Sequence, residues 1–394
     1  MNIVRQESHL TWYEVWGPIK PIKPEQQPLI LRLLIGQFNY YTMKALLLFP
    51  FLFLAFACQP VQKGEVFGDL EIIDPFSVDF DKAGEVYGVE FLKSNRVFHI
   101  TKSGKVTFIG GVQSVLKSRA GDQGTDDGLD PMLAHFNGMH DLAVGPDGSI
   151  YLADSFNYRV RKIDKVTGEL STIVGTGVQG YSGDGGRGHL AQVGGIYSMS
   201  FNADYSRLFM ADLPNQRIRV LDMATNTIST IAGTGEKKAS EEGALASETT
   251  LLDPRAVLVD KQGEIYILSR QGHALSVIDK KGRIRTVVNK AGERGYSGDG
   301  GPGEFAKMAG PKHLALDTDG SILITDTENH LIRSYNPETG IIDLLVGVPK
   351  KRGSVLADEP LQTELARPHG SRVRDGWLYV ADSENNRVIR FSHP

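Results

Sequence analysis

Acidic side chains recur in this sequence at a nearly constant spacing, each at the end of a short apolar run. Asp154, Asp212 and Asp382 are each followed by Asn three positions later and by Arg two positions after that. Asp326 keeps the Asn but has Leu in place of the Arg, and Glu90 takes the same slot with one residue inserted. Carboxylates that converge on one face can bind a cation such as Ca²⁺. The alternative is structural, with Asn capping its own turn and Asp accepting turn amides and pairing with Arg.

A second set of side chains with chemical potential lies just before the first strand expected in each unit. This slot contains two imidazoles, a phenol and two cations among its six residues, which are Phe76, His140, Tyr197, Arg255, Lys312 and His369. His313 adjoins the slot. We expect these residues to surround the mouth of a central channel. There they could bind an anion, or a metal through the histidines.

The metal candidates form two ligand sets. Zinc would use His140 and His369, although catalytic zinc usually has three protein ligands. Calcium would use carboxylates that turn inward, namely Glu90, Asp154, Asp212, Asp326 and Asp382. The sequence has no GxSxG nucleophile elbow, and its single cysteine is Cys58.

Two glycine-rich runs, residues 180–186 and 295–301, share the letters Gly-Tyr-Ser-Gly-Asp-Gly-Gly, and residues 124–128 are a degenerate third copy. No GKS/T sequence follows them, so a phosphate-binding loop is disfavoured. Metal binding by Asp184 and Asp299 is the functional alternative, but the runs lack the alternating acids of a calcium loop. We interpret them as structural turns between units.

The elements that carry these residues repeat along the chain. The slots of Glu90, Asp154, Asp212, Ser269, Asp326 and Asp382 are separated by 64, 58, 57, 57 and 56 residues. Each unit before the last contains four short runs with the period-2 alternation of β-strands, as in residues 159–163 and 170–174. Four antiparallel strands per unit predict an all-β fold, a six-bladed β-propeller in residues 64–394. Unit four has Ser269 in place of the acid and has also lost the Asn and the Arg.

The two ends of the repeat region complement each other. The last unit stops after its third strand, near residues 387–391, while residues 65–73 belong to no unit. We expect this N-terminal segment to supply the outermost strand of the last blade, because closure of the ring removes an unpaired edge.

Composition agrees with a globular β-rich protein. The chain has 394 residues, 44 glycines, 41% hydrophobic residues and a formal net charge of −4. Glycine exceeds its usual share of ~7%, as expected for a chain with many tight turns. The absence of a basic face argues against nucleic acid as a partner.

Residues before the repeats resemble a bacterial lipoprotein signal. Met43 and Lys44 precede the apolar run 45–56, and Cys58 follows Leu54-Ala-Phe-Ala57. The run is shorter than the ~20 residues of a membrane span. The resemblance implies export and lipidation at Cys58, with residues 1–42 as an upstream extension outside the fold. The other interpretation is an ordinary signal peptide with a nearby cysteine.

The repeats themselves resemble NHL repeats, and Asn329-His330-Leu331 reproduces the three letters of that name. Two propeller enzyme families are also similar in architecture. Peptidyl-hydroxyglycine amidating lyases hold zinc with three histidines, and His140, Tyr197 and His369 could match that pattern, but Arg255 stands where a third histidine would be needed. Gluconolactonase-like propellers hold a central calcium with Glu, Asn and Asp.

These observations favour a binding or interaction module that uses the face with the long loops. Its ligand would be a protein, a peptide or a small anion at the cell envelope, with the membrane reached only through the lipid anchor. We expect a monomer. The alternative is a metal-dependent lyase or lactone hydrolase that uses the central funnel.

Overall fold

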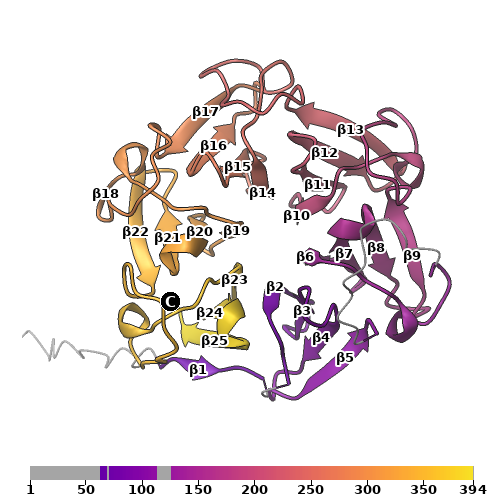
Figure 1. Cartoon of the computed structure of the whole chain (residues 1–394), viewed down its shortest axis with the longest axis horizontal. Helices are drawn as coiled ribbons and strands as arrows, with labels where there is room; N and C mark the ends of the chain where they lie inside the picture. The colour runs from indigo at the N-terminus through magenta and orange to yellow at the C-terminus, as the bar shows by residue number, and fades with distance from the viewer. Residues whose placement is uncertain (1–62, 69–70, 113–125, 394) are drawn as a thin grey trace, which may run out of the picture. The chain divides into compact units, whose positions relative to one another are not determined.

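The computed structural model describes residues 63–68, 71–112 and 126–393. In this part of the chain, six antiparallel sheets surround a central axis as the blades of a propeller (Figure 1). The predicted fold is confirmed. The expected upstream extension, the signal segment 43–58 and Cys58 lie outside the described residues.

Each blade has four strands in chain order from the axis outward, except that blade 5 has a fifth strand at its outer edge and blade 6 takes its outer strand from before blade 1. Blade 1 contains β2 (Pro75–Phe80), β3 (Val86–Glu90), β4 (Val97–Ile100) and β5 (Val106–Gly110). Blade 2 contains β6 (Met139–Val144), β7 (Ile150–Asp154), β8 (Arg159–Ile163) and β9 (Leu170–Val174). Blade 3 contains β10 (Ile196–Phe201), β11 (Arg207–Asp212), β12 (Arg217–Asp222) and β13 (Thr227–Ala232).

The second half of the ring repeats this order. Blade 4 contains β14 (Pro254–Val259), β15 (Ile265–Ser269), β16 (Ala274–Ile278) and β17 (Ile284–Val288). Blade 5 contains β19 (His313–Leu316), β20 (Ile322–Asp326), β21 (Leu331–Tyr335) and β22 (Ile341–Val346), with β18 (Gly301–Pro302) added at its outer edge. Blade 6 contains β23 (Gly370–Arg374), β24 (Trp377–Asp382), β25 (Arg387–Ser392) and the distant β1 (Glu65–Val66).

Short 3₁₀ turns lie in the links between blades and after several second strands. They are η2 (Pro131–Leu133), η3 (Ser155–Asn157), η4 (Gly188–Leu190), η5 (Gly303–Phe305), η6 (Thr327–Asn329), η7 (Pro360–Gln362) and η8 (Ser383–Asn385). Among the described residues, no helix is long and apolar enough to cross a membrane.

The ring closes as the sequence predicts. β1 pairs antiparallel with β25, with Glu65 opposite Arg390, so a strand from before blade 1 completes blade 6. The pairing is shorter than residues 65–73, because only Glu65 and Val66 form the ladder. Phe67 and Ile72 are instead buried in the apolar cluster between blades 1 and 6. Closure therefore combines a short ladder with packing of aromatic and aliphatic side chains.

The apolar core is divided among the interfaces between blades. Six clusters are found, and each takes most of its side chains from two neighbouring blades. Alternate residues of each strand face opposite sides of the sheet, so both faces of a blade are covered by its neighbours. This explains why many strand residues are buried without interruption, as in β6 and β7.

A residue in the left-handed conformation ties each of five blades to the next one. His330, with φ 61°, accepts the backbone N–H of Arg367 on Nδ1 at 3.0 Å. The same role falls to a second histidine and to Asn and Gln side chains. These are Asn95, Gln216, His273 and Asn386, which accept the amides of Gly138, Asp253, Gly310 and Asp74. The histidine of the Asn-His-Leu triplet is thus a neutral acceptor between blades.

Two faces result from the alternation of strand direction. We call the face with the turns after the second strands and the links between blades the link face, and the opposite one the hairpin face. The central axis opens on both faces, in one cavity at the link face and another at the hairpin face.

Candidate functional site

The six slot residues of the sequence lie together at the link-face end of the axis. Phe76, His140, Tyr197, Arg255, Lys312 and His369 line one cavity of about 300 Å³, which we call the funnel. Its rim adds charged residues, namely Asp74, Lys93, Arg270, Arg367 and Glu384. His313, which was grouped with them, does not line the funnel and lies deeper on the axis.

The buried acids at the ends of the second strands place the funnel residues. Asp154 accepts the backbone N–H of Asn137 at 2.8 Å, and Asn137 lies three positions before His140. The same contact holds the chain three positions before each of four other slot residues, through the pairs Ile73–Glu90, Gly194–Asp212, Ala309–Asp326 and Ala366–Asp382. A carboxylate in the blade therefore fixes where the incoming link begins the first strand.

These acids are consumed by contacts inside their own blades. Asp154 is fully buried, and Asn157 donates Nδ2 to both of its carboxylate oxygens. Burial raises the pKa of Asp154 and nearby Arg161 opposes that change. The resulting pKa is about 6, so the carboxylate is ionised at neutral pH. The backbone amide that Asp154 accepts belongs to the preceding link, whereas the sequence suggested backbone amides of the turn.

The arginine that pairs with the acid is also not the expected one in three blades. Arg161, Arg219 and Arg333, two positions after the pattern position, are the largest fully buried side chains. Each lies within 3.7 Å of its blade's acid and also pairs with an acid of the preceding link, Asp127, Asp184 or Asp299. Arg159 and Arg217 instead donate to carbonyls of the link that follows their blade, those of Thr176 and Thr234. The glycine-rich links are therefore structural, as expected, and their aspartates serve buried arginines.

Both funnel histidines are held in one orientation by serines. Nδ1 of His140 lies 2.9 Å from Oγ of Ser155, and Nδ1 of His369 lies 2.9 Å from Oγ of Ser383. Each serine donates its proton to a backbone carbonyl at the start of the next blade, Ile196 or Pro75. The imidazole Nδ1 must then be the donor, which leaves Nε2 as an acceptor. Burial lowers the pKa of both histidines well below the usual range, so they are neutral.

The two cations of the slot, Lys312 and Arg255, differ in whether a carboxylate lies beside them. Nζ of Lys312 lies 3.0 Å from Glu328 and 3.2 Å from Nε2 of His369. Burial lowers the pKa of Lys312 to about 8, although Glu328 opposes that change. Arg255 donates Nη1 to the carbonyl of Tyr197 at 2.7 Å, and no carboxylate of the described residues lies within 4.0 Å of it. Burial lowers the pKa of Arg255 to about 10, so it remains charged at neutral pH.

Aromatic rings form one wall of the funnel. Phe76 stacks on His369 at 3.9 Å between ring centroids and meets His140 edge-on at 5.3 Å. Tyr197 lies 3.9 Å from His140 and 5.2 Å below the Arg255 guanidinium. The funnel thus combines an apolar wall with two cations and neutral acceptors.

A buried acid and histidine occupy the axis beneath the funnel. Asp141 accepts from Ser77 Oγ at 2.6 Å and from the Met199 amide at 2.8 Å, and His313 Nε2 lies 3.9 Å from it. Asp141 was missed in the sequence, although it directly follows His140. His313 was selected because it directly follows the slot residue Lys312. The position directly after a slot residue was therefore the signal that could have identified Asp141.

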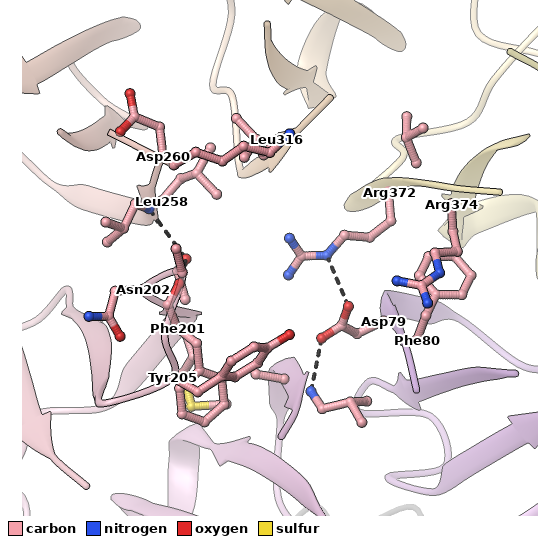
Figure 2. A pocket seen from close by; sticks show the side chains of 18 residues that line it. Asp79, Phe80, Phe201, Asn202, Tyr205, Leu258, Asp260, Leu316, Arg372 and Arg374 are labelled. Carbon is pink, nitrogen blue, oxygen red and sulfur yellow. Dashed lines mark hydrogen bonds and ion pairs between the residues drawn. The ribbon is translucent and has the colours of Figure 1, made fainter. Parts of the chain in front are cut away.

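Figure 2 shows the other cavity, at the hairpin face. It measures about 380 Å³. Arg372 extends toward its centre and lies 3.8 Å from Asp79, which accepts the Val144 amide at 2.8 Å. Tyr205 and Leu258 lie on the opposite wall. No residue of this mouth was selected from the sequence.

The residues expected to bind metal are not gathered into one ligand set in the described part of the chain. Among residues 63–68, 71–112 and 126–393, no group of three or more His, Cys, Asp or Glu side chains is arranged to hold a metal ion. Glu90, Asp154, Asp212, Asp326 and Asp382 each remain in a separate blade and accept amides there. His140 and His369 keep Nε2 as an acceptor, but no third His, Cys, Asp or Glu of the described residues joins them, as a three-ligand zinc site would need.

The described part of the chain is a six-bladed β-propeller. Its blades are NHL repeats, as the sequence pattern and the curated relatives agree. Protein SUPPRESSOR OF QUENCHING 1 of Arabidopsis thaliana is 27% identical over 290 residues, which are 69% of this chain and 26% of that protein. Human NHL repeat-containing protein 2 is 22% identical over 349 residues, 80% of this chain and 46% of that protein. The chain thus spans less than half the length of these relatives, and no protein-family model matches it.

Solved structures give the same fold. An auxiliary nutrient binding protein from Bacteroides thetaiotaomicron has a TM-score of 0.59 at 13% identity, covering 84% of this chain and 72% of that chain. A streptogramin B lyase has a TM-score of 0.51 at 16% identity, covering 84% of this chain and 97% of that chain. At these identities the likeness extends to the fold alone.

The contacts of the buried acids predict a large effect of removing one charge. In Asp212→Asn, the new side-chain NH₂ group could face the NH₂ group of Asn215, so that two donors meet. The substitution also removes one of the two carboxylates that lie beside Arg219. We expect the free energy of unfolding to fall by about 2–4 kcal/mol, measured by urea denaturation. The surface control Asp343→Asn should change it by less than about 0.5 kcal/mol. Equal effects of the two variants would contradict this role of the acid.

Proposed function

We propose that this protein is a ligand-binding propeller whose funnel holds an anionic group of a small molecule or peptide. The observation that carries the proposal is Arg255, a funnel-lining cation that is 3% exposed and has no carboxylate within 4.0 Å among the described residues. A buried charge without a counter-ion costs several kcal/mol, roughly 3–5 in proteins where a partner was removed. A carboxylate, sulfate or phosphate group in the funnel would supply that counter-ion.

The other funnel residues support the same chemistry. Lys312 adds a second cation beside Arg255, and the Nη donors of Arg255 suit the planar oxygens of an anion. The stacked rings of Phe76, His369 and Tyr197 give an apolar surface for the rest of the ligand. The funnel volume of about 300 Å³ lies at the lower end of the range of small-molecule sites.

Solved propellers of the same fold include an auxiliary nutrient binding protein and a streptogramin B lyase. The fold therefore supports binding and catalysis alike, and the choice depends on the site. Catalysis as a lyase or lactone hydrolase is the second candidate, and the contact between Lys312 and His369 favours it, because an amine with a pKa of about 8 can exchange protons near neutral pH. Turnover of lactone or eliminable substrates that is lost in Lys312→Met would select catalysis over binding.

We also propose that the protein acts at the cell envelope, exported and anchored through Cys58, as a monomer. This part of the proposal depends on the sequence of residues 43–58. Mass spectrometry of the mature protein tests it. The expected result is a lipidated N-terminal cysteine, and an unmodified peptide that spans residues 40–60 would reject it.

The anion site is tested with the variant Arg255→Gln. Sulfate and citrate are titrated into the purified protein by calorimetry, and we expect at least about tenfold weaker binding in the variant, the range for a charge-assisted hydrogen bond. Arg285→Gln, at an exposed position on β17, is the matched control and should bind like the wild type. Binding that is unchanged in Arg255→Gln would refute the anion site.

Lys312 predicts a pH dependence of the same binding. Its ammonium form is present below pH 8 and is lost as pH rises through its pKa of about 8. Sulfate keeps its charge throughout, so its affinity should be level from pH 6.5 to 7.5 and fall by about tenfold by pH 9.5. Arg255 and Arg367 stay charged over most of this range, and His369 stays neutral. In Lys312→Met the affinity should be lower at pH 7 and show no such decline; a decline of equal size there would assign it to another group.

A further inference from the structure

Blade 4 lacks the arginine that pairs with the slot acid in each of the other five blades. In blades 2, 3 and 5 the seventh residue after the anchoring acid slot is a fully buried arginine, Arg161, Arg219 or Arg333. In blades 1 and 6, Arg96 and Arg387 donate to Glu90 and Asp382 instead. The corresponding residue of blade 4 is Ser276, and β16 contains no arginine. The slot of the acid holds Ser269, which donates to the Leu252 carbonyl.

The contacts of the buried arginines in blades 3 and 5 show which groups the link offers to a guanidinium at this position. Arg333 donates to Asp299 of the preceding link and to the carbonyls of Ser297 and Lys307, at 2.8 to 3.0 Å. Arg219 contacts Asp184, the Ser182 carbonyl and the Gln192 carbonyl in the same way. The link thus supplies one carboxylate and two carbonyl oxygens to a planar cation.

The link before blade 4 follows the same path and keeps its acid. Gly243 donates to the Ile284 carbonyl at 2.8 Å, as Gly185 does to the Ile228 carbonyl. Glu242, directly before Gly243, therefore takes the place of Asp184, which directly precedes Gly185. Glu242 accepts the Thr286 amide at 2.9 Å through Oε1, and its Oε2 lies 4.0 Å from Nζ of the half-exposed Lys290.

Loss of large side chains around this acid leaves a cavity. Tyr181 and Tyr296, which stack on the arginines of blades 3 and 5, correspond to Ala239. A cavity of about 410 Å³ lies between the link and blade 4. Ala239, Ser240, Glu242, Ser269 and Ser276 all line it, and Ile267 and Leu252 supply apolar surface. The carboxylate of a guanidinium site remains there while the guanidinium is missing.

We propose that this cavity binds a guanidinium group from outside the chain, either the side chain of an arginine in a peptide or a small guanidinium compound. Glu242 supplies the charge, and the Ser240 carbonyl corresponds to the Ser182 and Ser297 carbonyls that accept from arginine. The small side chain of Ser276 stands where the other blades have arginine and leaves room for the group. The site lies away from the funnel and does not depend on its proposed function.

The probe is N-acetyl-arginine amide, with the neutral isostere N-acetyl-citrulline amide as its control. Calorimetry should detect binding of the arginine compound at least about tenfold tighter than that of the citrulline compound, since only the first carries a charge-assisted pair with Glu242. Equal binding of the two compounds would overturn the proposal. Methylguanidine and a short extended peptide with one central arginine distinguish the two sources of the group, by which of them binds more tightly.

Two variants test the position of the site. Ser276→Arg restores the missing side chain, so it should abolish binding of the probe and raise the melting temperature by about 2 °C, whereas Ser276→Ala should keep binding. Glu242→Gln should weaken binding at least about fivefold and does not depend on refilling the cavity, and Glu338→Gln is its exposed control. Undiminished binding in folded Ser276→Arg or in Glu242→Gln would place the probe elsewhere and refute the site.

Discussion

A buried carboxylate at the end of the second strand is the interaction on which the propeller depends. It accepts the amide of the incoming link, the side-chain amide of the turn and, at longer range, a buried guanidinium, as Asp326 does with Ala309, Asn329 and Arg333. Removal of such a charge from water is costly, so it persists only where its lone pairs are used. Because the amide donor lies three positions before a funnel residue, the same contact that stabilises the blade also sets the position of the site.

The sequence predicted the repeats, the strand order, the closure by an N-terminal strand and the side chains around the funnel. These follow from spacing and period-2 alternation, which are local. The choice between Arg159 and Arg161 did not follow, because both point to one side of β8 and only the path of the preceding link decides which is covered. The direction of the acidic side chains could not be predicted either. Each acid is the last residue before a turn, and the alternation of the strand does not indicate whether a side chain at that position faces the axis.

The contacts between blades show a second limit of sequence patterns. His330 and Asn386 accept an amide of the next blade from the same left-handed position, and so do Asn95 and Gln216. What these residues share is an acceptor atom at the correct reach and not a residue type. A pattern written in residue letters therefore records the histidine of one repeat, whereas the physical requirement is met by Asn, Gln or His.

Two charged groups of the blade 4 region have weak or missing partners. The link acid Glu242 has no buried cation, because Ser276 replaces the arginine, and lies 4.0 Å from the half-exposed Lys290. The funnel cation Arg255 has no carboxylate within 4.0 Å among the described residues. Five other blades retain their buried ion pairs, and apolar clusters pack at each interface, so the ring remains closed when one blade loses this contact. Structural redundancy of the repeats thus allows one blade to lose its buried ion pair. A buried charge such as Arg255, without a carboxylate partner among the described residues, is what a binding site can use.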